Sequence, residues 1–156
     1  MKKKKLFKII LISIAIIIIV ILGWKLTEKN KNIETKNNTP FFDTKILGNS
    51  KDLVSFSVSP GDSVSGILNV TGSVQGGYFF EANIQVNILD SNKKLLRAGN
   101  GNAKTEWMTS DPVGFDAVLD FTKLHKGPAY IEIHNDNPAG PNEGVNKSIL
   151  IPIIIK

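Results

Sequence analysis

The chain has 156 residues and contains no cysteine. This absence excludes disulfide bonds, thiolate metal sites and a cysteine nucleophile, and it also excludes a membrane anchor that depends on a lipid-modified cysteine. A domain without disulfides is stabilised by its hydrophobic core alone, and about 100 residues are enough to build such a core.

Histidine is also scarce, with two in the whole chain. His125 lies in a lysine-rich turn, and His134 lies on the polar side of a predicted strand. Acid–base and nucleophilic catalysis need titratable groups that converge on one point. Neither histidine belongs to a motif with a recognisable base or nucleophile, so both are interpreted as surface residues. We therefore predict no catalytic residue, no cofactor, no small-molecule substrate and no enzymatic activity.

An excess of basic residues is missing from most of the chain, although the formal net charge is +5. Five of the 19 basic residues lie within the first eight positions, and the other 14 are balanced by 14 acidic residues. From residue 53 onward there are 8 basic and 10 acidic residues. Nucleic-acid binding requires clustered positive charge, so no nucleic-acid partner is expected. The basic tail suits the anionic surface of a membrane.

One long hydrophobic segment is present, over residues 6–26. As a helix that rises about 1.5 Å per residue it would span about 31 Å, close to the hydrocarbon thickness of a bilayer. We predict a single-pass transmembrane signal anchor, with residues 1–5 as a basic cytoplasmic tail and the rest of the chain outside the cytoplasm. The lipid bilayer is thus an expected partner. The alternative is a cleaved signal peptide, but no small-x-small cleavage site follows the apolar run.

Residues 27–52 are rich in Lys, Asn, Thr and Glu and lack periodicity. Such a segment buries too little apolar surface to offset the entropy of ordering, which predicts a flexible tether. The exception is Pro40-Phe41-Phe42. This apolar segment would pack on the domain or enter the membrane surface, or it would serve as a short partner-binding motif.

Residues 53–156 show alternating apolar residues separated by turn signals, the pattern of an all-β sandwich or barrel. About seven strands are expected, and no helix. Their apolar positions mark them as Val54–Val58, Ile67–Val74, Phe80–Ile88, Leu95-Leu96, Phe115–Phe121, Ala129–Ile133 and Ser148–Ile155. Pro152 places the last strand at a sheet edge or a bulge. An immunoglobulin-like antiparallel sandwich fits this pattern, without the Cys…Trp…Cys pattern of antibody domains.

An ordered set of short motifs runs through this domain. They are Ser59-Pro60-Gly61-Asp62, Val70-Thr71-Gly72, Tyr78-Phe79-Phe80-Glu81-Ala82, Leu89-Asp90, Trp107-Met108-Thr109, Phe115, Asn137-Pro138-Ala139-Gly140 and Ile151-Pro152-Ile153. The set resembles the immunoglobulin-like domain of bacterial spore germination proteins, over about residues 56–155. The resemblance implies an immunoglobulin-like fold and a role as an interaction domain associated with germination.

The motif residues define a candidate binding or structural site. They are Phe80, Glu81, Trp107, Met108, Thr109, Asn137, Pro138 and Gly140. Trp107 lies in a predicted loop from Gly99 to Pro112. It would either cover the open end of the sandwich or act as an exposed binding anchor. Glu81 is expected on the polar face of a strand, as a solvated residue, as an acceptor for the Trp107 indole N–H, or as a ligand contact.

Two Asn- and Asp-rich segments raise the question of calcium, which prefers oxygen ligands. They are Asp90-Ser91-Asn92 and Asn135-Asp136-Asn137. Asn and Asp are also common turn residues, and neither segment has the alternating acidic run of a dedicated calcium loop. We interpret both as turns and predict no metal site.

Together these features predict a membrane-anchored, extracytoplasmic, non-enzymatic interaction module whose partner is an envelope protein or a cell-wall component. The alternative is a structural spacer or assembly subunit of a larger envelope complex. The environment of Trp107 would help to distinguish the two, because an exposed ring favours binding and a buried ring favours the spacer.

Overall fold

The computed structural model describes residues 44–137 and 144–156. The predicted tail, the predicted anchor over residues 6–26, most of the tether including Pro40-Phe41-Phe42, and the motif residues Pro138 and Gly140 lie outside these ranges. Within the described ranges, no helix has the length and apolar character needed to cross a bilayer.

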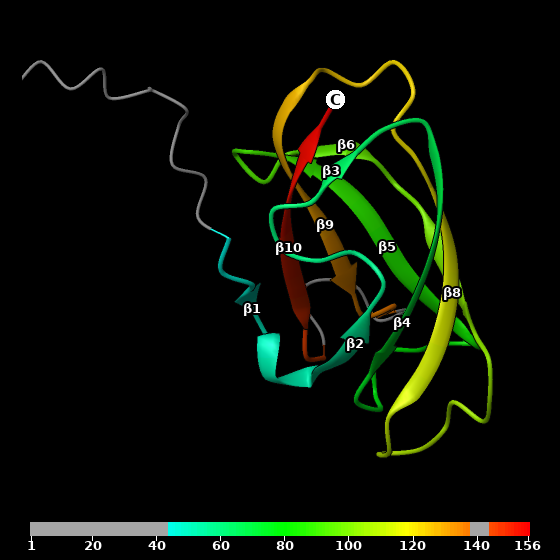
Figure 1. Cartoon of the computed structure of the whole chain (residues 1–156). Coiled ribbons are helices and arrows are strands. Elements are labelled where there is room, and N and C mark those ends of the chain that lie inside the picture. Colours follow the sequence, from blue (N-terminus) through cyan, green and yellow to red (C-terminus); the bar gives the residue numbers. More distant parts are fainter. Residues whose placement is uncertain (1–43, 138–143) are drawn as a thin grey trace, which may run out of the picture. The chain divides into compact units, whose positions relative to one another are not determined.

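The described chain is all-β and contains ten strands and one short 3₁₀ helix, η1, over Ser50–Asp52 (Figure 1). The strands are β1 Leu47–Gly48, β2 Leu53–Phe56, β3 Ser63–Val64, β4 Ile67–Val74, β5 Asn83–Asp90, β6 Leu95–Arg97, β7 Asn100–Ala103, β8 Val113–Asp120, β9 Gly127–His134 and β10 Ser148–Ile155. All strand pairs are antiparallel except that of β3 with β10, which is parallel.

The strands follow the order β1-β10-β9-β5-β7-β8-β4-β2, with β3 also on β10 and β6 also on β5. Buried residues of β4 and β8 nevertheless share one core cluster with those of β5, β9 and β10. Strands that are far apart in this order can share a core only if the sheet folds back on itself. Figure 1 shows the two halves facing each other, with β9 and β10 in one and β4 and β8 in the other.

Most of the alternating residues predicted to face inward form the core, but Phe80 and Val54 do not, since they are 38% and 53% exposed. Ile84, Val86 and Ile88 of β5 are almost fully buried, as are Phe115 and Leu119 of β8. Burying side chains of this size stabilises a fold by roughly 1.5–3 kcal/mol each before entropy is counted. The apolar alternation therefore supplies the driving force that closes the two halves on each other.

All seven predicted strands are present, with one correction to their bounds that affects the candidate site. The strand predicted from Phe80 begins instead at Asn83. Glu81 and Ala82 form the centre of a tight turn with φ of 47° and 62°, and Phe80 and Asn83 exchange two backbone hydrogen bonds of 3.0 and 2.9 Å. Positive φ at both central residues is the mark of a type I′ turn, whose twist matches that of the two strands it connects in a hairpin.

Three short strands were not predicted, and β7 is the most consequential. It lies inside the predicted loop from Gly99 to Pro112 and joins β5 to β8, so it connects the two halves of the sheet. Its Gly101 is buried, and a Cβ there would lie 3.0 Å from the Asp116 carbonyl oxygen and from Ile84 Cγ2. A Cβ at this distance would be tighter than most real Cβ contacts, so glycine favours the close approach of β7 to its neighbours.

The folded domain also begins earlier than predicted. The tether was expected to extend to residue 52, but Leu47 and Gly48 pair with Leu150 and Ile149 of β10. Asn49 strengthens this attachment, because its backbone N–H donates to the Ser148 carbonyl at 2.8 Å. The polar composition of this stretch concealed two strand residues whose partners are about 100 positions later.

The prediction that Pro152 lies at a sheet edge is confirmed locally. β10 pairs with β9 along its whole length. On its other side β1 pairs at Ile149 and Leu150, and β3 pairs at Ile154 and Ile155. Pro152 lies in the gap between these two short partners, where a missing backbone N–H breaks no ladder.

Candidate functional site

Three loops that are far apart in the sequence meet at one end of the domain. They comprise residues 75–82, 104–112, and 135–137 with 144–147, and we call this end the motif end. The Gly76 N–H donates to the Ser110 carbonyl at 3.3 Å, and the Asp136 N–H donates to the Tyr78 carbonyl at 3.0 Å. All the candidate residues that the structure describes lie in these loops.

The first two aromatic residues of the Tyr78-to-Ala82 motif are structural. Tyr78 is fully buried and Phe79 nearly so. The Tyr78 hydroxyl donates to Asp52 Oδ2 at 3.0 Å, and Lys147 Nζ lies 5.2 Å from the centre of its ring. Burial, followed by the hydrogen bond to Asp52, raises the pKa of Tyr78 well above its usual value. Tyr78 thus ties the start of the domain to two loops of the motif end.

The rest of this motif faces solvent. Phe80 is 38% exposed, and Glu81 is exposed at the tip of the turn. The expected hydrogen bond between Glu81 and the Trp107 indole does not form among the described residues. Its physical reason is the turn, because positive φ at Glu81 takes this residue off the strand face where that partner was expected. Glu81 remains a solvated residue that is available to a ligand.

Trp107-Met108-Thr109 divides between core and surface. The Trp107 ring is partly buried and packs against the hydrophobic core, as expected of a cover over the open end. Met108 is 74% exposed, and its backbone N–H donates to Glu106 Oε1 at 3.0 Å. Thr109 Oγ1 accepts the Asp111 N–H at 3.1 Å, which fixes the bend of the loop. The motif therefore fastens the loop through Trp107 and presents Met108 outward.

The Asn135-Asp136-Asn137 segment makes hydrogen bonds that hold its turn together. The buried Asn135 side chain accepts the Lys147 N–H at 2.6 Å and donates to the Val145 carbonyl at 2.9 Å. Asn137 donates to Asn146 Oδ1 at 3.2 Å. Within the described residues, no three His, Asp or Glu side chains gather where they could hold a metal ion.

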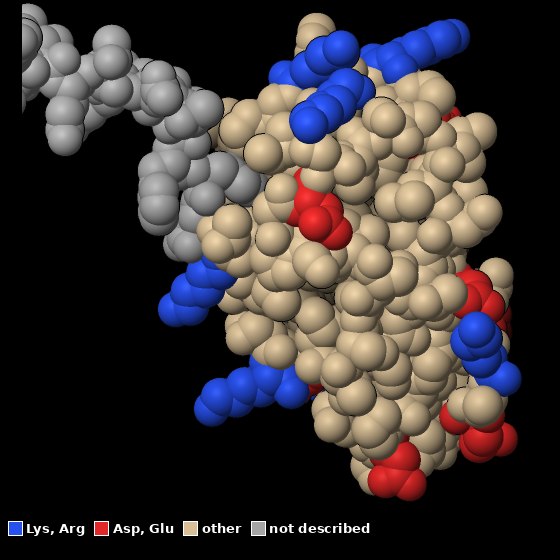
Figure 2. Space-filling model, viewed as in Figure 1, with Lys and Arg blue, Asp and Glu red and all other residues tan. Residues whose placement is uncertain are grey.

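Charge is divided between the two ends of the domain. Acidic side chains occupy the lower tip in Figure 2, and lysines gather at the top. The motif-end loops carry the exposed Glu81, Glu106 and Asp111, together with Lys104, which is paired with Asp116, and the partly buried Lys147. The turns at the opposite end carry exposed lysines, namely Lys93, Lys94, Lys123 and Lys126, with Lys156 on the last strand's end. The exposed apolar side chains of the motif end therefore lie on a surface with acidic groups.

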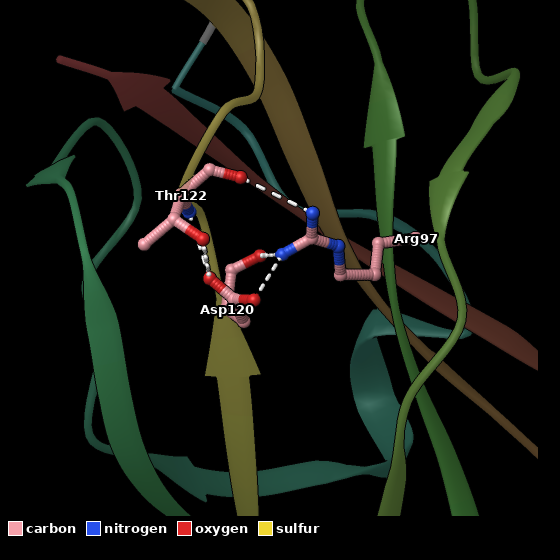
Figure 3. A network of polar contacts seen from close by, with 3 residues as sticks. All are labelled: Arg97, Asp120 and Thr122. Carbon is pink, nitrogen blue, oxygen red and sulfur yellow. Dashed lines mark hydrogen bonds and ion pairs between the residues drawn. The ribbon is translucent and has the colours of Figure 1, made fainter.

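A polar network fastens the opposite end (Figure 3). Arg97 of β6 pairs with the Asp120 carboxylate at the end of β8 and donates to the Thr122 carbonyl at 3.1 Å. The Thr122 hydroxyl and backbone N–H both donate to Asp120 Oδ1. Those two bonds, together with the Arg97 charge, lower the pKa of Asp120. β7 pairs with β8 only over residues 115–117, and the network links β6 to the end of β8 beyond that pairing. We therefore assign it a structural role.

The two histidines lie apart from one another. His125 is exposed in the turn before β9. His134 ends β9, and its Nδ1 lies 2.7 Å from the Asn135 carbonyl oxygen. The His134 contact is local to its own turn, and His134 is half-buried, so the interpretation as a surface residue holds for His125 alone.

The sequence interpretation missed a hollow of about 380 Å³ on the outer face of β4, β8 and β7. Its polar lining consists of Asn69, Thr71, Asn100, Asn102 and Asp116, and Val118 adds an exposed apolar side chain. The signal was present as asparagine at alternate positions of what proves to be β7, but the residues around it were predicted to be a loop.

Comparison with models of protein families, with curated proteins and with solved structures found no match.

Proposed function

We propose that this chain is a membrane-anchored, extracytoplasmic, non-enzymatic interaction module. Its N-terminal apolar segment holds the β domain at the lipid bilayer, and the motif end meets an envelope protein or a cell-wall component. The observation that carries the proposal is convergence. Three separate loops, each containing one of the motifs, are joined at one end by backbone hydrogen bonds. Loops positioned by a rigid sheet are common places for binding residues.

We further propose that the domain is an immunoglobulin-like sandwich. β2, β4 and β8 would form one sheet, and β6, β5, β9 and β10 the other, with β7 as the strand that passes between them. The parallel pairing of the early strand β3 with the last strand β10 supports this assignment, since an early strand that changes sheets is a feature of variable-type immunoglobulin domains. The resemblance to spore germination domains points to the same fold and to a germination-associated role.

The docking surface would centre on Phe80 and Met108. Single exposed apolar residues are common on proteins, but these two lie on loops that backbone hydrogen bonds hold at the same end of the domain. The Ala103 N–H donates to the Ala82 carbonyl at 2.8 Å, which joins the Phe80 turn to the strand that leads into the Met108 loop. Aromatic residues are enriched at binding hot spots, and methionine adapts to irregular partner surfaces. The surrounding acidic groups would favour a partner with basic or hydrogen-bond-donating groups.

Site-specific photo-crosslinking in intact cells tests this proposal with the full chain. A photoreactive amino acid at Phe80 or Met108 should give an adduct of discrete mass with an envelope component. The matched control is Leu95, which is 53% exposed on β6, away from the motif-end loops. Adducts that are the same from all three positions, or absent from Phe80 and Met108, would refute docking through the motif end.

The spacer alternative is supported by Trp107, whose ring packs on the core rather than standing free. In that case the N-terminal segment would be the specific element. Replacing residues 6–26 with an unrelated transmembrane segment should then abolish assembly with envelope partners, while Phe80→Ala and Met108→Ala would leave assembly intact. The interaction module predicts the reverse pattern.

A further inference from the structure

We propose that the outer hollow on β4, β8 and β7 is a binding site for a neutral saccharide. The hollow lies on the solvent face of three adjacent strands, not in the motif-end loops. In the strand register Asn69 lies opposite Val118, Thr71 lies opposite Asp116, and Asp116 also lies opposite Asn102. The side chains of these alternating positions point to the same face of the sheet, so they surround one volume of about 380 Å³.

The asparagine side chains of the hollow differ from those of β5 in their hydrogen bonding. The two asparagines of β5 use their carboxamides within the fold. Asn83 donates to the Glu81 carbonyl at 3.0 Å, and Asn87 donates to Glu132 Oε2 at 3.0 Å. By contrast, Asn69, Asn100 and Asn102 make no side-chain hydrogen bond to any described residue and are exposed.

Asparagine is disfavoured in strands. Three asparagines gathered on one face without internal partners therefore reduce strand stability with no compensating contact in the domain. Residues that break a local rule without an internal gain are expected at binding sites. Each carboxamide offers one acceptor and two donors, a combination that matches vicinal hydroxyl groups, which both donate and accept.

Exposed apolar side chains lie beside the amides of the hollow. Val118 is 59% exposed, and Ile67, two positions before Asn69 on the same face, is 69% exposed. An aliphatic surface beside amides suits the C–H faces and hydroxyl edges of a sugar ring. Three strands spaced about 4.8 Å apart span roughly 10 Å, which is about the length of two linked pyranose rings.

Charge distinguishes neutral from anionic ligands. Among the described residues, Asp116 is the one ionisable side chain that lines the hollow, and Lys104 Nζ lies 3.0 Å from its Oδ1. The pair carries no net charge, so the site offers no attraction to phosphate or to a polyanion. This selects a neutral saccharide over phosphorylated or acidic glycans.

The fold positions these groups through β7. Gly99 and Gly101 face the interior, where a Cβ at Gly99 would lie 2.7 Å from the Val86 carbonyl oxygen. The intervening Asn100 and the following Asn102 consequently face outward beside β8. The close approach of β7 to its neighbours thus supplies two of the three amides.

This inference stands apart from docking at the motif end, because none of the residues that line the hollow lies in the motif-end loops. Its test uses the full chain in lipid nanodiscs, since sugar-based detergents would compete for the site. The probes are the neutral trisaccharides cellotriose and chitotriose, with trigalacturonate as the anionic comparison, and binding is measured by calorimetry. We expect one neutral trisaccharide to bind with a Kd below about 1 mM, and trigalacturonate to bind at least tenfold more weakly.

Variants locate the binding. Asn69→Ala and Asn102→Ala should each weaken binding about fivefold to tenfold, the usual effect of losing one hydrogen bond. The nearly isosteric Asn102→Asp should also weaken it, which separates loss of the amide donor from loss of shape. Asn92→Ala, in the exposed turn that follows β5 and outside the lining of the hollow, is the matched control and should change the Kd less than twofold.

The proposal is overturned if neither neutral trisaccharide binds at 10 mM, if trigalacturonate binds as tightly, or if the Asn69 and Asn102 variants bind like the wild type. Self-association that is lost on Val118→Ala but retained in Val54→Ala would assign this face to a second copy of the chain instead. If the chain binds saccharide but a photoreactive residue at Met108 gives no adduct, docking at the motif end is refuted and the saccharide site stands.

Discussion

The side chain of Tyr78 combines complete burial with a hydrogen bond to the Asp52 carboxylate. Its neighbour Phe80, two positions later in the same motif, is 38% exposed. The alternation in the sequence placed Phe80 on the buried face of a strand, and this prediction is wrong, because Tyr78 and Phe79 are buried instead. The turn at Glu81 and Ala82 breaks that alternation. Positive φ is most common at glycine and asparagine. Because Glu81 and Ala82 are neither, the sequence did not indicate the turn that determines which aromatic rings are buried.

We expect Tyr78→Phe to lower the free energy of unfolding by about 2 kcal/mol at neutral pH, because a hydrogen bond to a charged acceptor is lost. The pKa of Tyr78 is raised in the folded state, so its contribution is complete below the ordinary tyrosine pKa of about 10 and declines as the pH rises above it. The difference between wild type and variant should therefore shrink between pH 8 and pH 11. Urea unfolding at both pH values measures it, and a constant difference would contradict the assignment.

Trp107 and Glu81 should act independently, since no hydrogen bond joins them among the described residues. Trp107→Ala removes a partly buried ring from the core surface and should cost about 2–3 kcal/mol, somewhat less than a fully buried aromatic. Glu81→Gln should change stability by less than about 0.5 kcal/mol, as surface substitutions usually do. The double variant should equal the sum of the two. A difference of more than about 0.5 kcal/mol between the double variant and that sum, measured by urea unfolding, would show that the two side chains interact.

β7 illustrates what could and could not be predicted at the scale of elements. The longer strands are evident in the sequence because each has several alternating apolar residues, as β8 has from Val113 to Leu119. β7 consists of Asn-Gly-Asn-Ala, which contains no large apolar side chain and reads as a turn. It is a strand because β5 and β8 supply partners on both sides. Pairing with two neighbouring strands thus overrides the low intrinsic strand propensity of asparagine and glycine.

A glycine pair on neighbouring strands tests this role of β7. Gly101→Ala places a Cβ 3.0 Å from a backbone oxygen and from Ile84, and overpacking of this kind costs about 1–3 kcal/mol. Gly114→Ala on β8 is the control, since its nearest atom would be the Lys104 Cδ at 3.7 Å. Thermal unfolding should show a clear drop for Gly101→Ala and little change for Gly114→Ala. Equal effects would mean that the close approach at β7 is not needed.

At the scale of the whole molecule, the arrangement joins a predicted membrane segment to a β domain with two chemically different ends. The all-β class followed from alternation and turn signals. The convergence of loops 75–82 and 104–112 did not, because it depends on how the sheet folds back through β7. The outer hollow was missed for the same reason, since Asn69 and Asn102 become neighbours of Asp116 and Val118 only across strand pairs. Location relative to the membrane remains a prediction from residues 6–26.

The absence of native cysteine makes single-cysteine labelling the most direct test of an extracytoplasmic module that docks through its motif end. A membrane-impermeant maleimide is added to intact spheroplasts that carry the full chain with Ser91→Cys or Met108→Cys, and rates are compared with those of the purified chain. Ser91 lies in an exposed turn away from the motif-end loops, and Ala129→Cys, at a position that is 1% exposed, is the buried control. We predict that Ser91→Cys is labelled as fast as in the purified chain, whereas Met108→Cys is labelled severalfold more slowly because a partner covers it. Labelling of Ser91→Cys only after permeabilisation would contradict the topology, and an unchanged rate at Met108→Cys would contradict docking at the motif end.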